Sequence, residues 1–352
     1  MRRSTVSALL TIATSLAILP SEGAAQARRV VERAQVTDAT IQAWKRYLVT
    51  HTNQGSYAEW NNIAPDRAVS ELRPFLFDVD PEIRIAAGWA IGGLRAHPAS
   101  GALAIAAGID SASDNTSKVR LAEAVSMYRA AASPAVPALI RALPSTEKEG
   151  VADRIIGALA LIGPAAAPAA DAVLTMAEDS SVAFYGSNNA ATWQYVVGVG
   201  SSLAPQAARL VHLLSLGRIG GFGDTLVVAT VGKLGLPAFN ALVRALSTKP
   251  ADMGAGSSLF LAVGYTRNPA AIPILLRYAT GAYDANWASE GMDIRVAAIN
   301  GLAAMGAAGG PALPELSELS DRYNSTHSDG DLGPSLAAQK AIHKIRMSQL
   351  SH

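Results

Sequence analysis

The chain has 352 residues, of which 50% are hydrophobic and 16% are charged. This balance excludes a disordered protein and supplies enough apolar side chains for a large core. The formal net charge is only +1, and no segment is rich in lysine or arginine. We therefore expect no nucleic-acid partner, because binding to a phosphate backbone depends on an excess of such residues. The sequence has no cysteine, which excludes disulfides, thiolate metal sites and a cysteine nucleophile.

Residues 1–27 have the layout of a secretory signal peptide. Arg2 and Arg3 precede an apolar run, Ala8–Leu19, and Ala25–Ala27 (AQA) places small residues before a cleavage point. The run is too short for a membrane anchor, which needs about 20 apolar residues, and no later segment qualifies. We therefore expect an exported protein, periplasmic or secreted, without a membrane span.

Helix-period spacing of apolar residues dominates the rest of the chain, and strand-like alternation is scarce. An N-terminal helix and cap are predicted over residues 28–65, and a short tail over 347–352. Between them, Pro, Gly, Asp and Asn divide the chain into helix pairs whose equivalent members lie about 30 to 42 residues apart, a period typical of two-helix repeats. The predicted pairs are Asp66–Phe77 with Pro81–Leu94, Pro98–Gly108 with Asn115–Ala130, Pro134–Leu143 with Thr146–Ile162, Ala166–Ala177 with Gly186–Val199, Ala204–Ser215 with Gly221–Leu234, Pro237–Leu246 with Asp252–Tyr265, Pro269–Ala279 with Ser289–Met305, and Pro311–Arg322 with Gly333–Arg346.

The two members of each pair differ in composition. The first tends to begin with a proline in its first turn, as in Gly235–Leu246 (GLPAFNALVRAL), where the missing N–H would be unsatisfied in any case. The second is rich in Ala and Gly, as in Ile83–Leu94 (IRIAAGWAIGGL). Small side chains allow helices to approach closely, and only stacking of the pairs buries the apolar face that one pair leaves open.

Three segments carry a resemblance to the HEAT-repeat family: Asp80–Leu94 (DPEIRIAAGWAIGGL), Asp293–Gly306 (DIRVAAINGLAAMG) and Ala158–Pro168 (ALALIGPAAAP). The family places an Asp between paired helices and an Arg in the first turn of the second, which Asp80 and Arg84 match. The fifth and sixth pairs lack both residues. Over residues 66–346 the resemblance implies an all-α fold, an α-solenoid of about eight stacked antiparallel helix pairs in a HEAT-like superhelix.

The resemblance implies a non-catalytic scaffold that binds a protein or peptide partner in the cell envelope, with the second helices on its concave side. Aromatic residues gather where the fourth and seventh pairs have long inner turns, and insertions in equivalent turns of such repeats often form the binding face. The alternative for each ring is a structural role in holding its turn against the stack. The candidate partner-binding residues are Phe184, Tyr185, Trp193, Tyr283 and Trp287.

Two other functions stay open: a hydrolase or lyase with a site between helix ridges, as the HEAT-like phycobilisome lyases illustrate, and a cell-wall glycan binder. Ser113–Asn115 (SDN) and Ser145–Lys148 (STEK) fit fragments of the serine β-lactamase signature, but their order is reversed and the KTG element is missing. We interpret both fragments as helix caps. No cofactor is predicted.

One polar segment, Asp321–Asp331 (DRYNSTHSDGD), concentrates oxygen ligands of the kind that bind calcium. Its spacing follows neither the EF-hand nor the nonapeptide pattern, and Asp, Asn and Gly are also common loop residues. The sequence therefore predicts a polar loop here and no metal site, and leaves calcium binding as an alternative.

Overall fold

The computed structural model describes residues 65–94, 97–143, 150–178, 188–219, 225–248, 253–282, 291–326 and 329–351. Within these ranges every regular element is a helix and none is a strand, so the predicted all-α class is confirmed. The predicted signal peptide and the predicted helix and cap at residues 28–64 lie outside the described residues.

The helices follow one another in pairs, and we call the two members of a pair its first and second helix. The first helix often begins or ends with a 3-10 segment (η). The pairs are α4 (Pro65–Leu72) and η3 (Arg73–Phe77) with α5 (Pro81–Gly93); α6 (Pro98–Ser111) with α7 (Asn115–Ser126); η4 (Arg129–Ala135) and α8 (Val136–Ala142) with α9 (Val151–Ile162); η5 (Gly163–Ala169) and α10 (Ala170–Glu178) with α11 (Asn188–Val199); η6 (Gly200–Gln206) and α12 (Ala207–Ser215) with α13 (Thr225–Gly232); α14 (Leu236–Leu246) with α15 (Met253–Tyr265); α16 (Ala271–Ala279) with α17 (Gly291–Ala304); and η8 (Gly306–Ala312) and α18 (Leu313–Thr326) with α19 (Asp329–Leu350).

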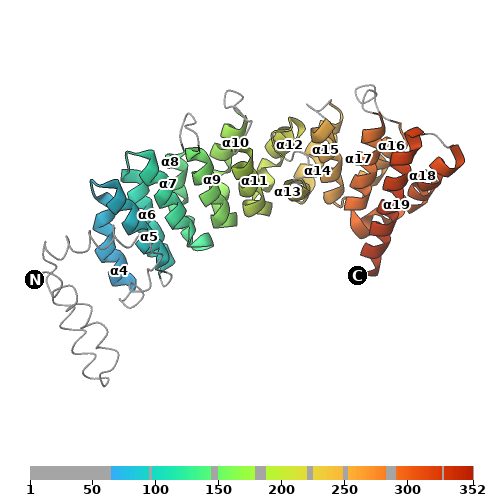
Figure 1. Cartoon of the computed structure of the whole chain (residues 1–352). Coiled ribbons are helices and arrows are strands. Elements are labelled where there is room, and N and C mark those ends of the chain that lie inside the picture. Colours follow the sequence, from blue (N-terminus) through green and yellow to red (C-terminus); the bar gives the residue numbers. More distant parts are fainter. Residues whose placement is uncertain are drawn as a thin grey trace, which may run out of the picture.

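Second helices form a continuous row. Each packs against the second helix of the next pair, from α5 on α7 to α17 on α19. First helices also contact their counterparts, as α6 does α8 and α12 does α14. Figure 1 shows the pairs in chain order along an elongated body, with α4 at one end and α19 at the other.

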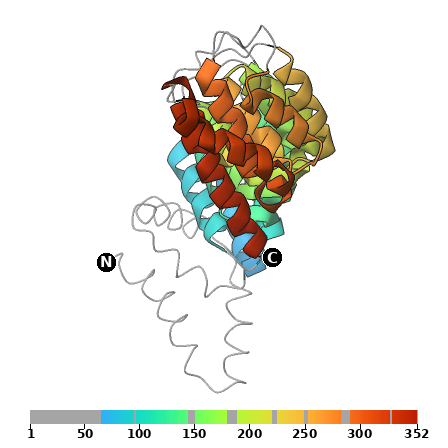
Figure 2. The same cartoon turned by 90° about the vertical axis from the view of Figure 1, so that its right-hand side faces the viewer.

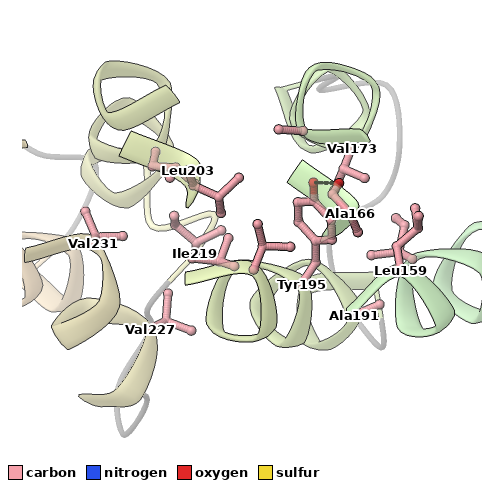
Figure 3. Close-up of a cluster of buried hydrophobic side chains, with 14 of the residues drawn as sticks. Leu159, Ala166, Val173, Ala191, Tyr195, Leu203, Ile219, Val227 and Val231 are labelled. Atoms are coloured by element: carbon pink, nitrogen blue, oxygen red, sulfur yellow. Dashed lines mark hydrogen bonds between the residues drawn. The ribbon is translucent and has the colours of Figure 1, made fainter. Parts of the chain in front are cut away.

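The apolar core runs between the two rows, and buried tyrosines within it donate hydrogen bonds to main-chain carbonyls, both inside one pair and between successive pairs. Tyr195 of α11 is fully buried and donates its hydroxyl to the carbonyl of Ala166 in η5, 3.0 Å away (Figure 3). Tyr278 makes the same kind of bond to the carbonyl of Leu246, at 3.2 Å, and Tyr128 to that of Ile91. Burial raises the pKa of Tyr195 and of Tyr128, so both phenols stay neutral donors.

Glycine sets the spacing between neighbouring second helices. A Cβ on Gly264 of α15 would lie 1.9 Å from the carbonyl oxygen of Gly301 in α17. A Cβ on Gly198 would lie 2.4 Å from the oxygen of Ala160, and one on Gly232 2.5 Å from that of Ala262. Real side chains never approach so closely, so the Ala- and Gly-rich composition of the second helices has a direct packing cause.

At several junctions the chain turns from a second helix into the next pair through a residue with positive φ. Gly163 and Gly235 hold this place with φ values of 78° and 82°, which glycine adopts without steric cost. Arg129 and Arg267 hold the equivalent place with φ of 53°, a conformation that costs an L-residue about 1–2 kcal/mol.

One helical stretch of the described residues, Val151–Glu178, is long and apolar enough to cross a membrane. The two helices Thr225–Gly232 and Leu236–Leu246, which are bent against each other, are also long and apolar enough if they are counted as one span. The first stretch is α9, η5 and α10 in succession, and the positive φ of Gly163 lies at the end of α9. Core helices of water-soluble proteins also pass this test.

Candidate functional site

Four of the five predicted partner-binding residues, Phe184, Tyr185, Tyr283 and Trp287, lie outside the described residues. The fifth, Trp193, lies on α11, where it is half-buried against the core. Its indole N–H is buried and has no hydrogen-bond partner, a state that typically costs about 1–3 kcal/mol. The structure thus gives Trp193 a packing role in addition to its partly exposed surface.

Trp193 belongs to a narrow outward stripe on α11. Side chains three to four positions apart share one face of a helix, and Trp193, Gln194 and Val197 are the half-buried or exposed positions of its middle turns. The same spacing recurs on the two second helices that follow. On α13, Leu226 is exposed and Thr230 half-buried, and on α15, Leu261 and Tyr265 are half-buried.

These stripes form one surface, because α11 packs on α13 and α13 on α15. None of the three helices carries a charged residue, although the exposed fraction of Leu226 reaches 60%. We call this surface the uncharged strip. It consists of Trp193, Val197, Leu226, Thr230, Leu261 and Tyr265.

Charged residues lie on the helices at both borders of the uncharged strip. On one side, α9 has Asp153 and Arg154, and Arg154 donates to Glu123 of α7 at 2.8 Å. On the other side, the α17 sequence includes Asp293 and Arg295. The lack of charge is therefore a local property of three consecutive helices, not of the whole row.

First helices carry ion pairs that join successive repeats. Arg141 of α8 makes a bidentate pair with Asp110 of α6, at 2.9 and 2.7 Å. Arg209 of α12 makes a second one with Glu178 of α10, at 2.8 and 2.7 Å, and a third contact to Asp171 at 2.6 Å. Ion pairs therefore join first helices and also the second helices α7 and α9, whereas α11, α13 and α15 carry no charged residue.

Arg84, one of the residues that carry the family resemblance, lies at the centre of a partly buried polar cluster. Its guanidinium pairs with Asp114 and donates to the Ser117 hydroxyl at 3.1 Å. It also donates to the carbonyls of Asp78, at 2.6 Å, and Val79, at 3.1 Å, in the turn after η3. The arginine therefore satisfies the end of one helix and connects it to the start of α7.

The SDN fragment contributes to this cluster as a helix cap. The Asp114 carboxylate accepts the N–H of Ser117, 2.7 Å away, as the N-cap of α7. This agrees with the capping interpretation of the fragment. The STEK fragment at 145–148 lies outside the described residues.

The polar segment Asp321–Asp331 differs from its prediction. The expected loop is wrong for most of its length, because α18 continues to Thr326 and α19 begins at Asp329. No group of three or more His, Asp or Glu that could hold a metal ion occurs in the part of the chain that the structure describes.

Comparison of the chain with protein-family models, with curated proteins and with solved structures gives no significant match. The HEAT resemblance therefore depends on the residues quoted for it and on the arrangement of the helices.

Proposed function

We propose that the chain is a HEAT-like α-solenoid, an exported non-catalytic scaffold that binds a protein or peptide partner in the cell envelope. The continuous rows of first and second helices support the solenoid, because each pair buries its apolar face only against its neighbours. The described residues offer no observation that favours a hydrolase, a lyase or a glycan binder over this proposal.

The uncharged strip is the observation that carries the binding function. Partly exposed Leu, Val, Trp and Tyr side chains on three adjacent helices provide apolar contact area, and aromatic residues are enriched among the anchors of protein interfaces. An uncharged surface also avoids the desolvation penalty that charged groups pay on binding. The partner is accordingly a segment with apolar, uncharged side chains.

A matched pair of leucines tests the assignment. Leu226 on α13 is 60% exposed and lies in the uncharged strip, whereas Leu103 on α6 is 56% exposed and lies in the row of first helices. In a pull-down from envelope extract, Leu226→Lys is expected to lower partner capture about tenfold or more, the effect of about 1.4 kcal/mol or more, and Leu103→Lys to leave it unchanged. Equal capture by both variants would remove the uncharged strip from the proposal.

The aromatic turns are tested in the same assay. Tyr185→Ala combined with Trp287→Ala is expected to reduce capture if the turn aromatics extend the binding surface. An early thermal transition in this double variant would instead assign the two rings a structural role. Normal capture with normal stability would confine binding to the described helices.

A further inference from the structure

The last helix of the stack has an uncovered side. α19 packs against α17, α18 and η8, and no described element lies beyond it. Figure 2, which looks toward this end of the body, shows α19 across the front of the other helices. Terminal repeats of stacked proteins normally carry a polar outer face that keeps them soluble.

The outer face of α19 combines exposed apolar side chains with polar and basic ones, among them Gln339, Lys340 and His343. Leu332, Leu336, Met347 and Leu350 are 40%, 48%, 50% and 80% exposed. Their spacing places them on one side of the helix, opposite the buried Ala338, Ala341 and Ile345. Elsewhere in the described residues, exposed large apolar side chains are spread over several helices and turns, whereas α19 alone carries four of them.

Basic side chains lie on α19 between these exposed apolar residues. Lys340, Lys344 and Arg346 are all exposed, and the sequence from 332 to its end contains no acidic residue. None of the three makes an ion pair with another residue of the described ranges, although Arg84, Arg141, Arg154 and Arg209 all do. We call Leu332, Leu336, Lys340, Lys344, Met347 and Leu350 the tail patch.

A complementary surface lies in the first helix pair. Val79, in the turn between η3 and α5, is 94% exposed, the highest value among the large apolar residues described, and Phe77 is 47% exposed. Acidic residues follow directly. Asp80 caps α5 by accepting the N–H of Glu82 at 2.9 Å, and the exposed Glu82 has no ion pair with a described residue. We call Phe77, Val79, Asp80 and Glu82 the head patch.

We propose that the head patch of one copy of the chain docks on the tail patch of a second copy. Each patch combines exposed apolar side chains with unpaired charge, and the charges are opposite. The patches belong to the first and last helix pairs, at opposite ends of the elongated body (Figure 1), so they cannot meet within one molecule. Contact between two tail patches would bring Lys340 and Lys344 against their own copies, which like-charge repulsion disfavours.

This contact joins two different surfaces and leaves one of each free at the ends of every assembly. Head-to-tail contacts of this kind produce open chains unless the rotation between copies closes a ring. The protein is therefore expected to form assemblies whose length grows with concentration.

Sedimentation velocity of the purified protein over a range of concentrations tests the proposal with two variants. Lys340→Glu with Lys344→Glu alters the tail patch, and Val79→Lys with Glu82→Lys alters the head patch. Wild type is expected to form concentration-dependent species of at least dimer size, and each variant alone is expected to stay monomeric. Lys233→Glu with Arg244→Glu makes the same charge change as the tail variant on α13–α14 and is expected to assemble like wild type.

An equal mixture of the two variants gives the sharpest test. The mixture contains intact head patches on one variant and intact tail patches on the other, so it is expected to assemble although neither variant does so alone. Circular dichroism melts of both variants confirm that they fold. The proposal would be overturned if the wild type stayed monomeric at every concentration. This includes the outcome in which the monomer binds vesicles of anionic lipid or an acidic peptide through α19. Assembly by the head variant alone would also overturn it, because α19 would then pair with itself.

Discussion

The guanidinium of Arg84 in α5 forms an ion pair with the carboxylate of Asp114, the cap of α7, and thereby connects the first two helix pairs. The pair is asymmetric in exposure: the side chain of Arg84 is 11% exposed and that of Asp114 35%. Arg84 is therefore the more buried member, and its partners compensate the burial of its charge. It donates five hydrogen bonds to four acceptors: two to the Ser117 hydroxyl and one each to the Asp78 carbonyl, the Val79 carbonyl and the Asp114 carboxylate.

Removal of this arginine is expected to destabilise the protein. Arg84→Met removes the guanidinium that donates to Asp114 and to the carbonyls of Asp78 and Val79. We expect a loss of about 2–3 kcal/mol in the free energy of unfolding, somewhat below the ~3–5 kcal/mol typical of a fully buried pair. Arg120→Met is the matched control, because Arg120 is 51% exposed in its pair with Glu123 and such pairs contribute about 0–1 kcal/mol. Urea denaturation of the two variants measures the difference, and equal midpoints would contradict the role of the cluster.

The pairing of Arg84 with Asp114 also predicts that the free energy of unfolding depends on pH. Burial alone would raise the pKa of Asp114, but hydrogen bonds from Ser117 and Arg84 outweigh it and hold the pKa below its usual value. A carboxyl with a lowered pKa in the folded state contributes stability above its unfolded value of about 3.9, and this contribution is lost as the pH falls through the folded value. The free energy of unfolding of Asp114→Asn should therefore lie below that of wild type at neutral pH, and the gap should narrow on acidification below about pH 4. A gap that is constant from neutral to acidic pH would contradict the lowered pKa.

Helix pairing could be predicted from the sequence because its signals are local. Apolar periodicity marks each helix, and glycine and proline mark the turns where a positive φ and a proline-containing first turn occur, as at Gly163 and Pro164. Asp80 is a second example, since a cap depends only on residues two or three positions away.

Contacts between repeats were not predictable in this way. The sequence indicates that Arg84 follows an Asp, but its ionic partner is Asp114 of the next repeat, which only the stacking of α5 on α7 brings within reach. The 3-10 starts of several first helices were also missed. Their proline residues predict a helix start, but not whether the first turn is wound as an α-helix or more tightly.

The candidate site was predicted only in part. The sequence analysis considered only aromatic residues near long turns. It therefore included Trp193, which lies on the uncharged strip, but not Leu226 and Leu261 on the next two helices. A usable signal was present, since α11, α13 and α15 have no charged residue. Whether an uncharged side chain on these helices is buried or exposed depends on the neighbouring helices. The spacing of apolar residues in the sequence does not determine this.

Ala87 tests the packing of the second helices at the N-terminal end. It is fully buried in α5. Ala87→Glu is expected to unfold the first repeats or to lower the melting midpoint strongly, because an unpaired charge forced into the core costs several kcal/mol. Ala99→Glu places the same side chain at an exposed position in the first turn of α6 and should leave the midpoint nearly unchanged. An unchanged midpoint in Ala87→Glu would mean that the buried face of α5 is misassigned.

Export predicts a shortened N-terminus. If residues 1–27 act as a signal peptide, the protein recovered from outside the cytoplasm should begin at or near Arg28, since Ala25–Ala27 supplies the small residues that signal cleavage requires. Mass spectrometry of the intact protein and of its N-terminal peptide measures this directly. Recovery of the chain from the cytoplasm with Met1 still in place would contradict export.

Two glycines in second helices should respond oppositely to the same substitution. In Gly264→Ala the new Cβ would lie 1.9 Å from the backbone oxygen of Gly301, so α15 and α17 must move apart; we expect a loss of about 1–3 kcal/mol, the usual cost of overpacking. Around Gly157 of α9 no atom lies within 4 Å of a new Cβ, and Gly157→Ala should stabilise the helix by about 0.5–1 kcal/mol because alanine loses less backbone entropy on folding. Chemical denaturation of both variants separates close packing from helix propensity. If both gained stability, the second helices would not approach as closely at Gly264 as the structure places them.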